Sequence, residues 1–282
     1  MPTNEPRANK TERRDEARLK ALQLRAQQKS REKRNRTIAI GGLVAAVAVL
    51  AVVVVLILGQ TKGTERVAYS GAAVKLADVP KPSTAEATGA IPVGLRGAAG
   101  EKPLKGDVVV AVYLDYMCPY CEKFETANDA ELAKLRAAGG VTIEYHPISI
   151  LDQGSQGTEY STRAANAAAV VADKAPDKFP AFNSAMFVNP PAENSKGLSD
   201  AEIAQRALAA GVSQTVVDQF TATASGQPWR TFAPFVAALT EQARVDLGDG
   251  YGTPSVLING KKFAGDMYTV GPLTQAIVAA KG

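Results

Sequence analysis

The feature that most constrains this chain is an uncharged apolar run, IAIGGLVAAVAVLAVVVVLIL, at residues 38–58. A helix over this run would be about 30 Å long, which matches the hydrocarbon thickness of a bilayer. Gly41, Gly42 and the valines would disfavour a helix in water, but in lipid only a helix satisfies the backbone polar groups. We therefore expect a single transmembrane helix at 38–58.

A cleaved signal peptide is the alternative interpretation of this run. Such a peptide has an apolar core of about 7–15 residues behind a short basic start, and a small-residue cleavage site. Here a long segment, residues 1–37, precedes the run, and the sequence GQTK at 59–62 offers no such site. Both observations favour an uncleaved anchor.

The flanks of the run predict its orientation. Residues 1–37 contain twelve Lys and Arg against five Asp and Glu, whereas only Lys62 and Arg66 follow the run closely. The positive-inside rule therefore places the basic tail, 1–37, in the cytoplasm and the rest outside the cell membrane. The tail either lies as a helix on anionic lipid or serves only as a topology signal. Because the basic charge is confined to this tail, we expect no nucleic-acid partner.

The exported part divides into a linker and a folded domain. Residues 59–89 are rich in Ala, Gly, Thr and Pro and predict an extracytoplasmic linker, and residues 90–282 predict the domain. Strands are expected at 90–93, at the Val-rich run 107–114 and at 141–145, with a helix at 119–138. A strand, a helix and a second strand predict the βαβ unit of a parallel sheet.

A long Ala-rich stretch then replaces the strands. Four or five helices are expected, at 158–173, 177–188, 199–210, 213–225 and 229–247. Strands return at 255–258 and 262–264, joined by Asn259-Gly260, a strong hairpin signal, and a last helix is expected at 272–281. The fold class is therefore α/β, with a helical insertion at about 155–247.

Both cysteines of the chain lie in one motif, Cys118-Pro119-Tyr120-Cys121. The motif follows the buried strand and opens a helix, so Cys118 lies at a helix N-terminus, where the backbone N–H groups and the helix dipole favour a thiolate. Cys121 comes one turn later, within reach of Cys118. Pro119 suits the first helical position, where its missing N–H has no partner to lose.

Other roles for the motif fit less well. A structural disulfide would close too short a loop to stabilise the fold much. A metal site needs four ligands, and a haem attachment site needs His after the second Cys, where this chain has Glu122. A buried reduced pair conflicts with an oxidising compartment. We expect a redox-active pair and no metal or cofactor.

A second motif, Gly252-Thr253-Pro254-Ser255, directly precedes a predicted strand. A proline at a strand start removes one N–H from the ladder, and a cis Thr253–Pro254 bond would leave backbone polar groups free to pair with an extended peptide. Alone, this would be an ordinary loop proline. Beside the CxxC motif, it predicts a substrate-binding loop.

These motifs carry a resemblance to a known family. The sequence VVAVYLDYMCPYC at 109–121, the Ala-rich insert and GTPSVLING at 252–260 resemble the DsbA-like branch of the thioredoxin superfamily, in its membrane-anchored, actinobacterial form. The resemblance covers about residues 90–282 and implies a thioredoxin-like fold. It also implies that Cys118 is the exposed nucleophile, that Cys121 is the resolving thiol, and that Thr253-Pro254 faces the substrate.

The resemblance further implies an enzyme that introduces disulfides into exported proteins and is reoxidised by a quinone-linked membrane partner. One departure bears on this: the best-known members carry His where this chain has Tyr120, which together with Pro119 tunes the motif. Because Pro-Tyr also occurs in glutaredoxins, which act as reductants, an isomerase or reductase remains an alternative. A non-catalytic envelope scaffold is the alternative from another class.

Three further ionisable residues are weaker candidates for a role at the site. Asp115 and Glu144 are either proton acceptors for Cys121 or simply hydrogen-bonded or solvated acids. His146, the single histidine of the chain, is expected to be structural.

Overall fold

The computed structural model describes residues 68–282. The predicted basic tail and transmembrane helix lie outside the described residues, so both stay predictions. Among residues 68–282, no helix combines the length and apolarity that crossing a membrane requires.

A five-stranded mixed sheet forms the centre of the described part. Its strands are β1 (Ile91–Val93), β2 (Val108–Leu114), β3 (Val141–Pro147), β4 (Ser255–Ile258) and β5 (Lys261–Lys262). They lie in the order β1-β3-β2-β4-β5, and β2 and β3 are parallel whereas the other neighbours are antiparallel. The predicted parallel βαβ unit is therefore confirmed.

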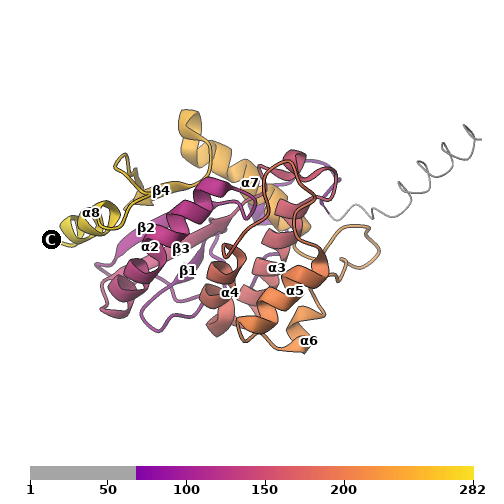
Figure 1. Cartoon of the computed structure of the whole chain (residues 1–282), viewed down its shortest axis with the longest axis horizontal. Helices are drawn as coiled ribbons and strands as arrows, with labels where there is room; N and C mark the ends of the chain where they lie inside the picture. Colours follow the sequence, from indigo (N-terminus) through magenta and orange to yellow (C-terminus); the bar gives the residue numbers. More distant parts are fainter. Residues whose placement is uncertain (1–67) are drawn as a thin grey trace, which may run out of the picture. The chain divides into compact units, whose positions relative to one another are not determined.

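Helices cover both faces of this sheet (Figure 1). Helices α2 (Pro119–Ala137) and α8 (Pro272–Lys281) pack against each other on one side. Helix α7 (Ala233–Leu247) covers the other side, where the Tyr113 hydroxyl donates a hydrogen bond to Asp246 at 3.0 Å. The Val-rich sequence of β2 follows from this layering, because both faces of the strand are covered.

The β4–β5 hairpin forms where the sequence predicted it. Asn259 and Gly260 have φ angles of 48° and 75°, the left-handed values that a tight two-residue hairpin requires. The second strand is shorter than predicted. Beyond Lys262 only Phe263 continues the ladder, through one bond from its N–H to the carbonyl of Val256, before the chain turns away at Gly265.

The helical insertion lies between β3 and β4. It contains α3 (Tyr160–Lys174), α4 (Phe179–Met186), α5 (Asp200–Ala209) and α6 (Gln214–Val217), followed by α7, with 3₁₀ turns at 152–155, 176–178 and 248–250. Six of the thirteen buried residues of α3 are alanines, whose small side chains let α7 pack closely against it. A thioredoxin-like sheet with a helical insertion is therefore the fold, as the sequence predicted.

Two helix bounds within the insertion were predicted wrongly. The helix expected at 213–225 ends at Val217, because the chain turns back so that Thr223 can pair with Arg230. The helix expected from residue 229 begins only at Ala233, where Pro234 occupies the first turn. Sequence periodicity did not reveal this reversal of direction.

Asp200 ties the insertion together. Its carboxylate oxygens lie 2.9 Å from the Arg163 guanidinium and 2.7 Å from the Arg230 guanidinium. Burial favours protonation of Asp200, but both guanidiniums outweigh it and lower the pKa of Asp200.

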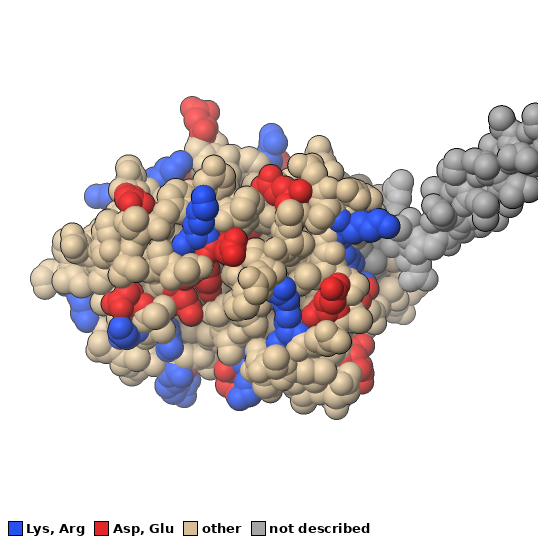
Figure 2. Space-filling view, in the orientation of Figure 1, with Lys and Arg blue, Asp and Glu red and all other residues tan. Residues whose placement is uncertain are grey.

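On the face of the molecule shown in Figure 2, Lys and Arg side chains are interspersed with Asp and Glu side chains.

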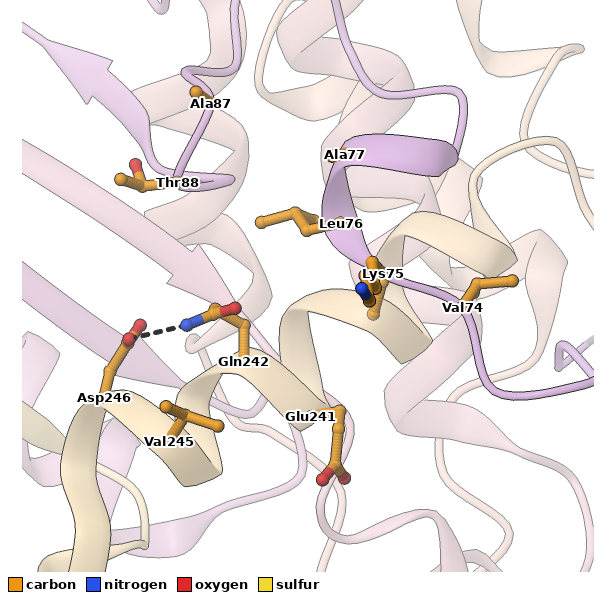
Figure 3. A pocket seen from close by; sticks show the side chains of 11 residues that line it. Val74, Lys75, Leu76, Ala77, Ala87, Thr88, Glu241, Gln242, Val245 and Asp246 are labelled. Atoms are coloured by element: carbon orange, nitrogen blue, oxygen red, sulfur yellow. Dashed lines mark hydrogen bonds between the residues drawn. The ribbon is translucent and has the colours of Figure 1, made fainter.

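The segment before β1 contacts the folded domain. Leu76, in the 3₁₀ turn η2 (Leu76–Asp78), and Val79 are buried in the core, although both fall in the stretch that the sequence assigned to the linker. A hollow of about 500 Å³ lies between this segment and α7. Figure 3 shows the side chains that line it, among which the Gln242 amide donates a hydrogen bond to Asp246. Neither cysteine lines this hollow, so the redox chemistry lies elsewhere.

Candidate active site

The two cysteines lie where β2 leads into α2. After Leu114 a short turn brings the chain to Cys118, which is the N-cap of α2 with an extended backbone (φ −78°, ψ 118°). Pro119 follows as the first helical residue. Cys121 comes one turn further, and its N–H donates to the carbonyl of Cys118 at 3.0 Å. Both cysteines are free thiols, so the structure shows the reduced pair.

The loop at 252–255 lies directly against the first cysteine. The Thr253–Pro254 peptide bond is cis, and the Cys118 thiol donates a hydrogen bond to the carbonyl oxygen of Thr253 at 3.3 Å. Cys118 is 4 % exposed and Cys121 1 %. The predicted exposed nucleophile is therefore largely covered in the reduced structure, and exposure alone does not distinguish the two thiols.

Electrostatics distinguishes the two thiols clearly. Hydrogen bonding from the Cys121 thiol lowers the pKa of Cys118 to about 6, against the opposing effect of burial, and hydrogen bonds from the Thr253 side chain and from the backbone N–H groups of Cys121 and Tyr120 add to the effect. Burial raises the pKa of Cys121 well above its ordinary value, and the hydrogen bond to Cys118 and the negative charge of the Cys118 thiolate raise it further. Cys118 is therefore the thiolate near neutral pH, and Cys121 keeps its proton.

Asp115 organises the turn that precedes Cys118. Its fully buried carboxyl group accepts hydrogen bonds from Met117 N–H (2.9 Å), Leu151 N–H (2.9 Å) and the Ser161 hydroxyl (2.6 Å). Burial outweighs these donors and raises the pKa of Asp115 to about 7. Its carbonyl oxygen also accepts the N–H of Cys118 at 3.0 Å. Of Asp115 and Glu144, Asp115 is the acid that the structure brings close to the cysteines.

Glu144 and His146 lie on the sheet face that α7 covers. They stand opposite Ala111 and Tyr113 of β2, and the His146 ring stacks on the Tyr113 ring with centroids 4.2 Å apart. Burial lowers the pKa of His146 to about 4, so the ring is neutral. A packed, neutral ring agrees with the structural role expected for His146.

An exposed aromatic pair joins Tyr120 of the CxxC motif to Tyr268. The rings of Tyr120 and Tyr268 have centroids 5.7 Å apart, and Lys123 Nζ lies 5.0 Å from the Tyr120 ring centroid. A groove of about 550 Å³ runs beside them, lined by Glu122, Lys123, Thr126, Ala127, Tyr268, Thr269 and Val270. The groove lies along the first half of α2, and its lining includes the two residues that follow Cys121.

Sequence reasoning did not identify the loop that carries Tyr268. The buried Asn128 side chain of α2 donates to the carbonyls of Phe124 and Met267, both at 2.8 Å. Asp266 accepts the N–H of Tyr268 at 2.8 Å and so shapes the loop. Because the contact between Asn128 and Met267 joins residues 139 positions apart, no local pattern could have revealed it.

Within the described part, no group of three or more His, Cys, Asp or Glu side chains could hold a metal ion. The groups that the structure brings together at this site are the two sulfurs and the 252–255 loop. A CxxC at a helix N-terminus, facing a cis-proline loop on a thioredoxin-like sheet with a helical insertion, defines a DsbA-like thiol–disulfide oxidoreductase of the thioredoxin superfamily.

Comparison with known proteins places the chain in this class. Residues 102–276 match the family model described as thioredoxin, and the chain belongs to that family. No curated protein sequence matches it significantly.

Solved structures show the same fold. DsbA from Mycobacterium tuberculosis, in its oxidised form, is 26 % identical with a TM-score of 0.53, and the match covers 68 % of this chain and 100 % of that one. MdbA, a thiol-disulfide oxidoreductase from Actinomyces oris, is 21 % identical with a TM-score of 0.56, covering 73 % and 93 %. BdbD from Bacillus subtilis is 19 % identical with a TM-score of 0.54, covering 72 % and 97 %.

Proposed function

We propose that this protein introduces disulfides into exported proteins on the outer face of the cell membrane, with Cys118 and Cys121 as its catalytic residues. The observation that carries the proposal is the asymmetric pair: Cys118 has a pKa of about 6 and lies 3.3 Å from the cis-proline loop, whereas Cys121 stays protonated beneath it. A low-pKa thiol is a good leaving group, which favours release of an oxidised substrate.

The reaction begins with the Cys118–Cys121 disulfide. A substrate thiolate attacks Cys118 Sγ, the S–S bond breaks, and its electron pair goes to Cys121 Sγ, which takes up a proton. The second substrate thiolate then attacks the substrate sulfur of the mixed disulfide, and Cys118 leaves as a thiolate. The substrate loses two electrons and gains a disulfide, while the enzyme gains both electrons.

Substrate recognition is assigned to the surroundings of Cys118. Thr253 and Pro254 would present free backbone groups to an extended peptide. Pro119 and Tyr120 would tune the motif, and the groove beside Tyr120 and Tyr268 would receive apolar side chains. Exported proteins with cysteine pairs are the proposed substrates.

The rest of the cycle is proposed from the family resemblance and from the predicted membrane helix. The reduced pair must pass two electrons to an oxidant, for which we propose a quinone-linked membrane protein. The predicted helix at 38–58 would keep both proteins in one membrane, with the catalytic domain outside and the tail inside. Protease added to intact cells should remove the domain but spare the tail, and protection of the domain would contradict this orientation.

The decisive experiment is the reduction potential of the Cys118–Cys121 couple, measured on the full chain in detergent with glutathione buffers. Strong oxidants of this type have reduction potentials of about −120 mV, and thioredoxin has a reduction potential of about −270 mV. A value above about −180 mV supports the oxidase. A value near that of thioredoxin would assign the same site to a reductant.

An isomerase or reductase is the second candidate. It is favoured by Tyr120 in place of the family's His, and by a Cys118 pKa of about 6, which is closer to the value of about 7 in thioredoxin than to about 3.5 in DsbA.

A non-catalytic scaffold is tested separately by alkylating the reduced protein at mildly acidic pH. Rapid labelling of Cys118 rules the scaffold out, and labelling only after denaturation rules the enzyme out.

A further inference from the structure

A buried asparagine of the helical insertion contacts the chain on both sides of the CxxC motif. Asn183 of α4 is fully buried, and its side-chain oxygen accepts a hydrogen bond from the Tyr116 hydroxyl at 3.0 Å. Its side-chain nitrogen donates to Glu125 Oε1 at 2.9 Å. Tyr116 lies two positions before Cys118, and Glu125 lies four positions after Cys121, one helical turn further along α2.

Neighbouring contacts support the two hydrogen bonds of Asn183. The Tyr116 ring packs on the Phe187 ring just beyond α4, with centroids 5.2 Å apart. The Ser184 hydroxyl, next to Asn183, lies 3.1 Å from Glu125 Oε1. The turn before Cys118 and the helix after Cys121 are therefore fixed to the same short stretch of the insertion.

We propose that Asn183 is a positioning residue for the Cys118 thiolate. By hydrogen-bonding to both Tyr116 and Glu125, Asn183 holds in place the segments on either side of the two cysteines. The thiolate is stabilised by the Cys121 thiol, by the Thr253 side chain and by the N–H groups of Cys121 and Tyr120, so its stability depends on where the first turn of α2 lies relative to the 252–255 loop. Asn183 contacts the chain on both sides of that turn, at Tyr116 and at Glu125. This gives the inserted domain a direct role in the reactivity of the motif.

Glu125 supports this arrangement as a neutral group. Burial, with a smaller contribution from the Asp129 carboxylate, raises the pKa of Glu125 to about 8. At pH 6 it therefore accepts the Asn183 hydrogen bond as a protonated acid. A glutamine at this position keeps an acceptor oxygen without a charge, so Glu125→Gln should leave Cys118 reactivity unchanged at pH 6.

The test compares Asn183→Leu with a matched variant, Asn166→Leu. Asn166 of α3 is also fully buried, donates one hydrogen bond to the Phe220 carbonyl at 3.0 Å and accepts one from the Phe232 N–H at 2.9 Å. Both substitutions thus remove one donated and one accepted bond at a buried site. Only Asn183 contacts the segments that flank the cysteines.

The measurement is the alkylation rate of Cys118 in the reduced full chain as a function of pH. We expect Asn183→Leu to lower the rate at pH 6 by about two- to fivefold, the loss of thiolate that a rise of about half to one unit in a pKa of about 6 produces. Asn166→Leu should keep the wild-type profile. Equal losses in both variants, or no loss in Asn183→Leu, would overturn the proposal.

If Asn183→Leu does not fold, Tyr116→Phe serves as a second variant, because it removes only the hydroxyl that Asn183 accepts. It should lower the rate at pH 6 by about twofold, and a wild-type profile would contradict the proposal. The inference rests on the proposed function in taking Cys118 as the reacting sulfur. Alkylation needs no protein substrate, so it succeeds or fails independently of disulfide exchange.

Discussion

The thiol of Cys118 donates a hydrogen bond to the carbonyl oxygen of Thr253, 3.3 Å away and 135 positions further along the chain. The β2–β4 pairing produces this contact, because the antiparallel register sets Tyr113 opposite Ser255, where β2 ends and β4 begins. The two motifs are thereby brought to the same edge of the sheet. A substrate that reaches Cys118 must therefore contact the 252–255 loop.

The cysteines should have separable roles. We expect Cys118→Ser to abolish disulfide exchange, because it removes the sulfur that a substrate attacks. Cys121→Ser should instead accumulate mixed disulfides, because the Cys118 thiolate can still attack a disulfide of a partner protein, whereas the Cys121 thiol that would attack Cys118 and release that partner is gone. Mass spectrometry of non-reduced complexes from cells expressing each variant measures both outcomes. Exchange above background in Cys118→Ser would place the reactive sulfur elsewhere.

The reduced protein should gain stability with rising pH through Cys118. Its folded pKa of about 6 lies below the ordinary value of 9.0, so above pH 6 the folded thiol loses its proton before the unfolded thiol does. Stability from this group therefore rises with pH, by about 2–3 kcal/mol between pH 6 and pH 8, and is lost as pH falls through 6.

Denaturant unfolding of the reduced wild type at each pH measures this effect. Reduced Cys118→Ser serves as the reference, because it retains the buried acids Asp115 and Glu125, whose raised pKa values act in the opposite direction. The difference between the two proteins isolates Cys118. A difference that stays flat from pH 6 to pH 8 would contradict the lowered pKa.

The elements around the motif could be predicted because their signals are local. Val-rich β2, Pro119 at the start of α2 and Asn259-Gly260 in the hairpin each depend on neighbours in the sequence. Even the juxtaposition of Cys118 with Thr253 was accessible, through the resemblance of both motifs to one family.

The contacts that shape the thiolate environment could not be predicted in this way. Asn183, Ser161 and Asn128 are ordinary polar residues on helices, and their partners lie between 4 and 139 positions away. Nothing in local periodicity separates a buried hydrogen-bonding asparagine from a solvated one. The coverage of Cys118 was missed for the same reason, since it depends on how closely a distant loop packs.

Asp115 should be costly to remove. Asp115→Ala would leave the N–H groups of Met117 and Leu151 and the Ser161 hydroxyl without their acceptor in a fully buried site. Unmade hydrogen bonds of this kind cost about 1–3 kcal/mol each, so we expect a loss of about 3 kcal/mol or more in the free energy of unfolding. Denaturant unfolding of the oxidised protein measures it.

Asp266→Ala provides the comparison for that loss. Asp266 also accepts a backbone N–H, from Tyr268, but in an exposed loop where water can replace it. Its removal should therefore destabilise the protein less than the loss of Asp115. Equal losses in the two variants would show that the buried Asp115 network contributes no more than a surface turn.

The residue at position 120 should set how oxidising the pair is. A histidine there can donate a ring N–H to the Cys118 thiolate, so Tyr120→His should lower the Cys118 pKa further below about 6. Stabilising the thiolate stabilises the reduced form, and a shift of one pKa unit displaces the equilibrium with glutathione about tenfold toward the reduced enzyme. Tyr120→Phe is the control, because it keeps an aromatic ring beside Tyr268 and adds no donor. An unchanged equilibrium in Tyr120→His would mean that the Thr253 loop and the α2 backbone alone determine the potential.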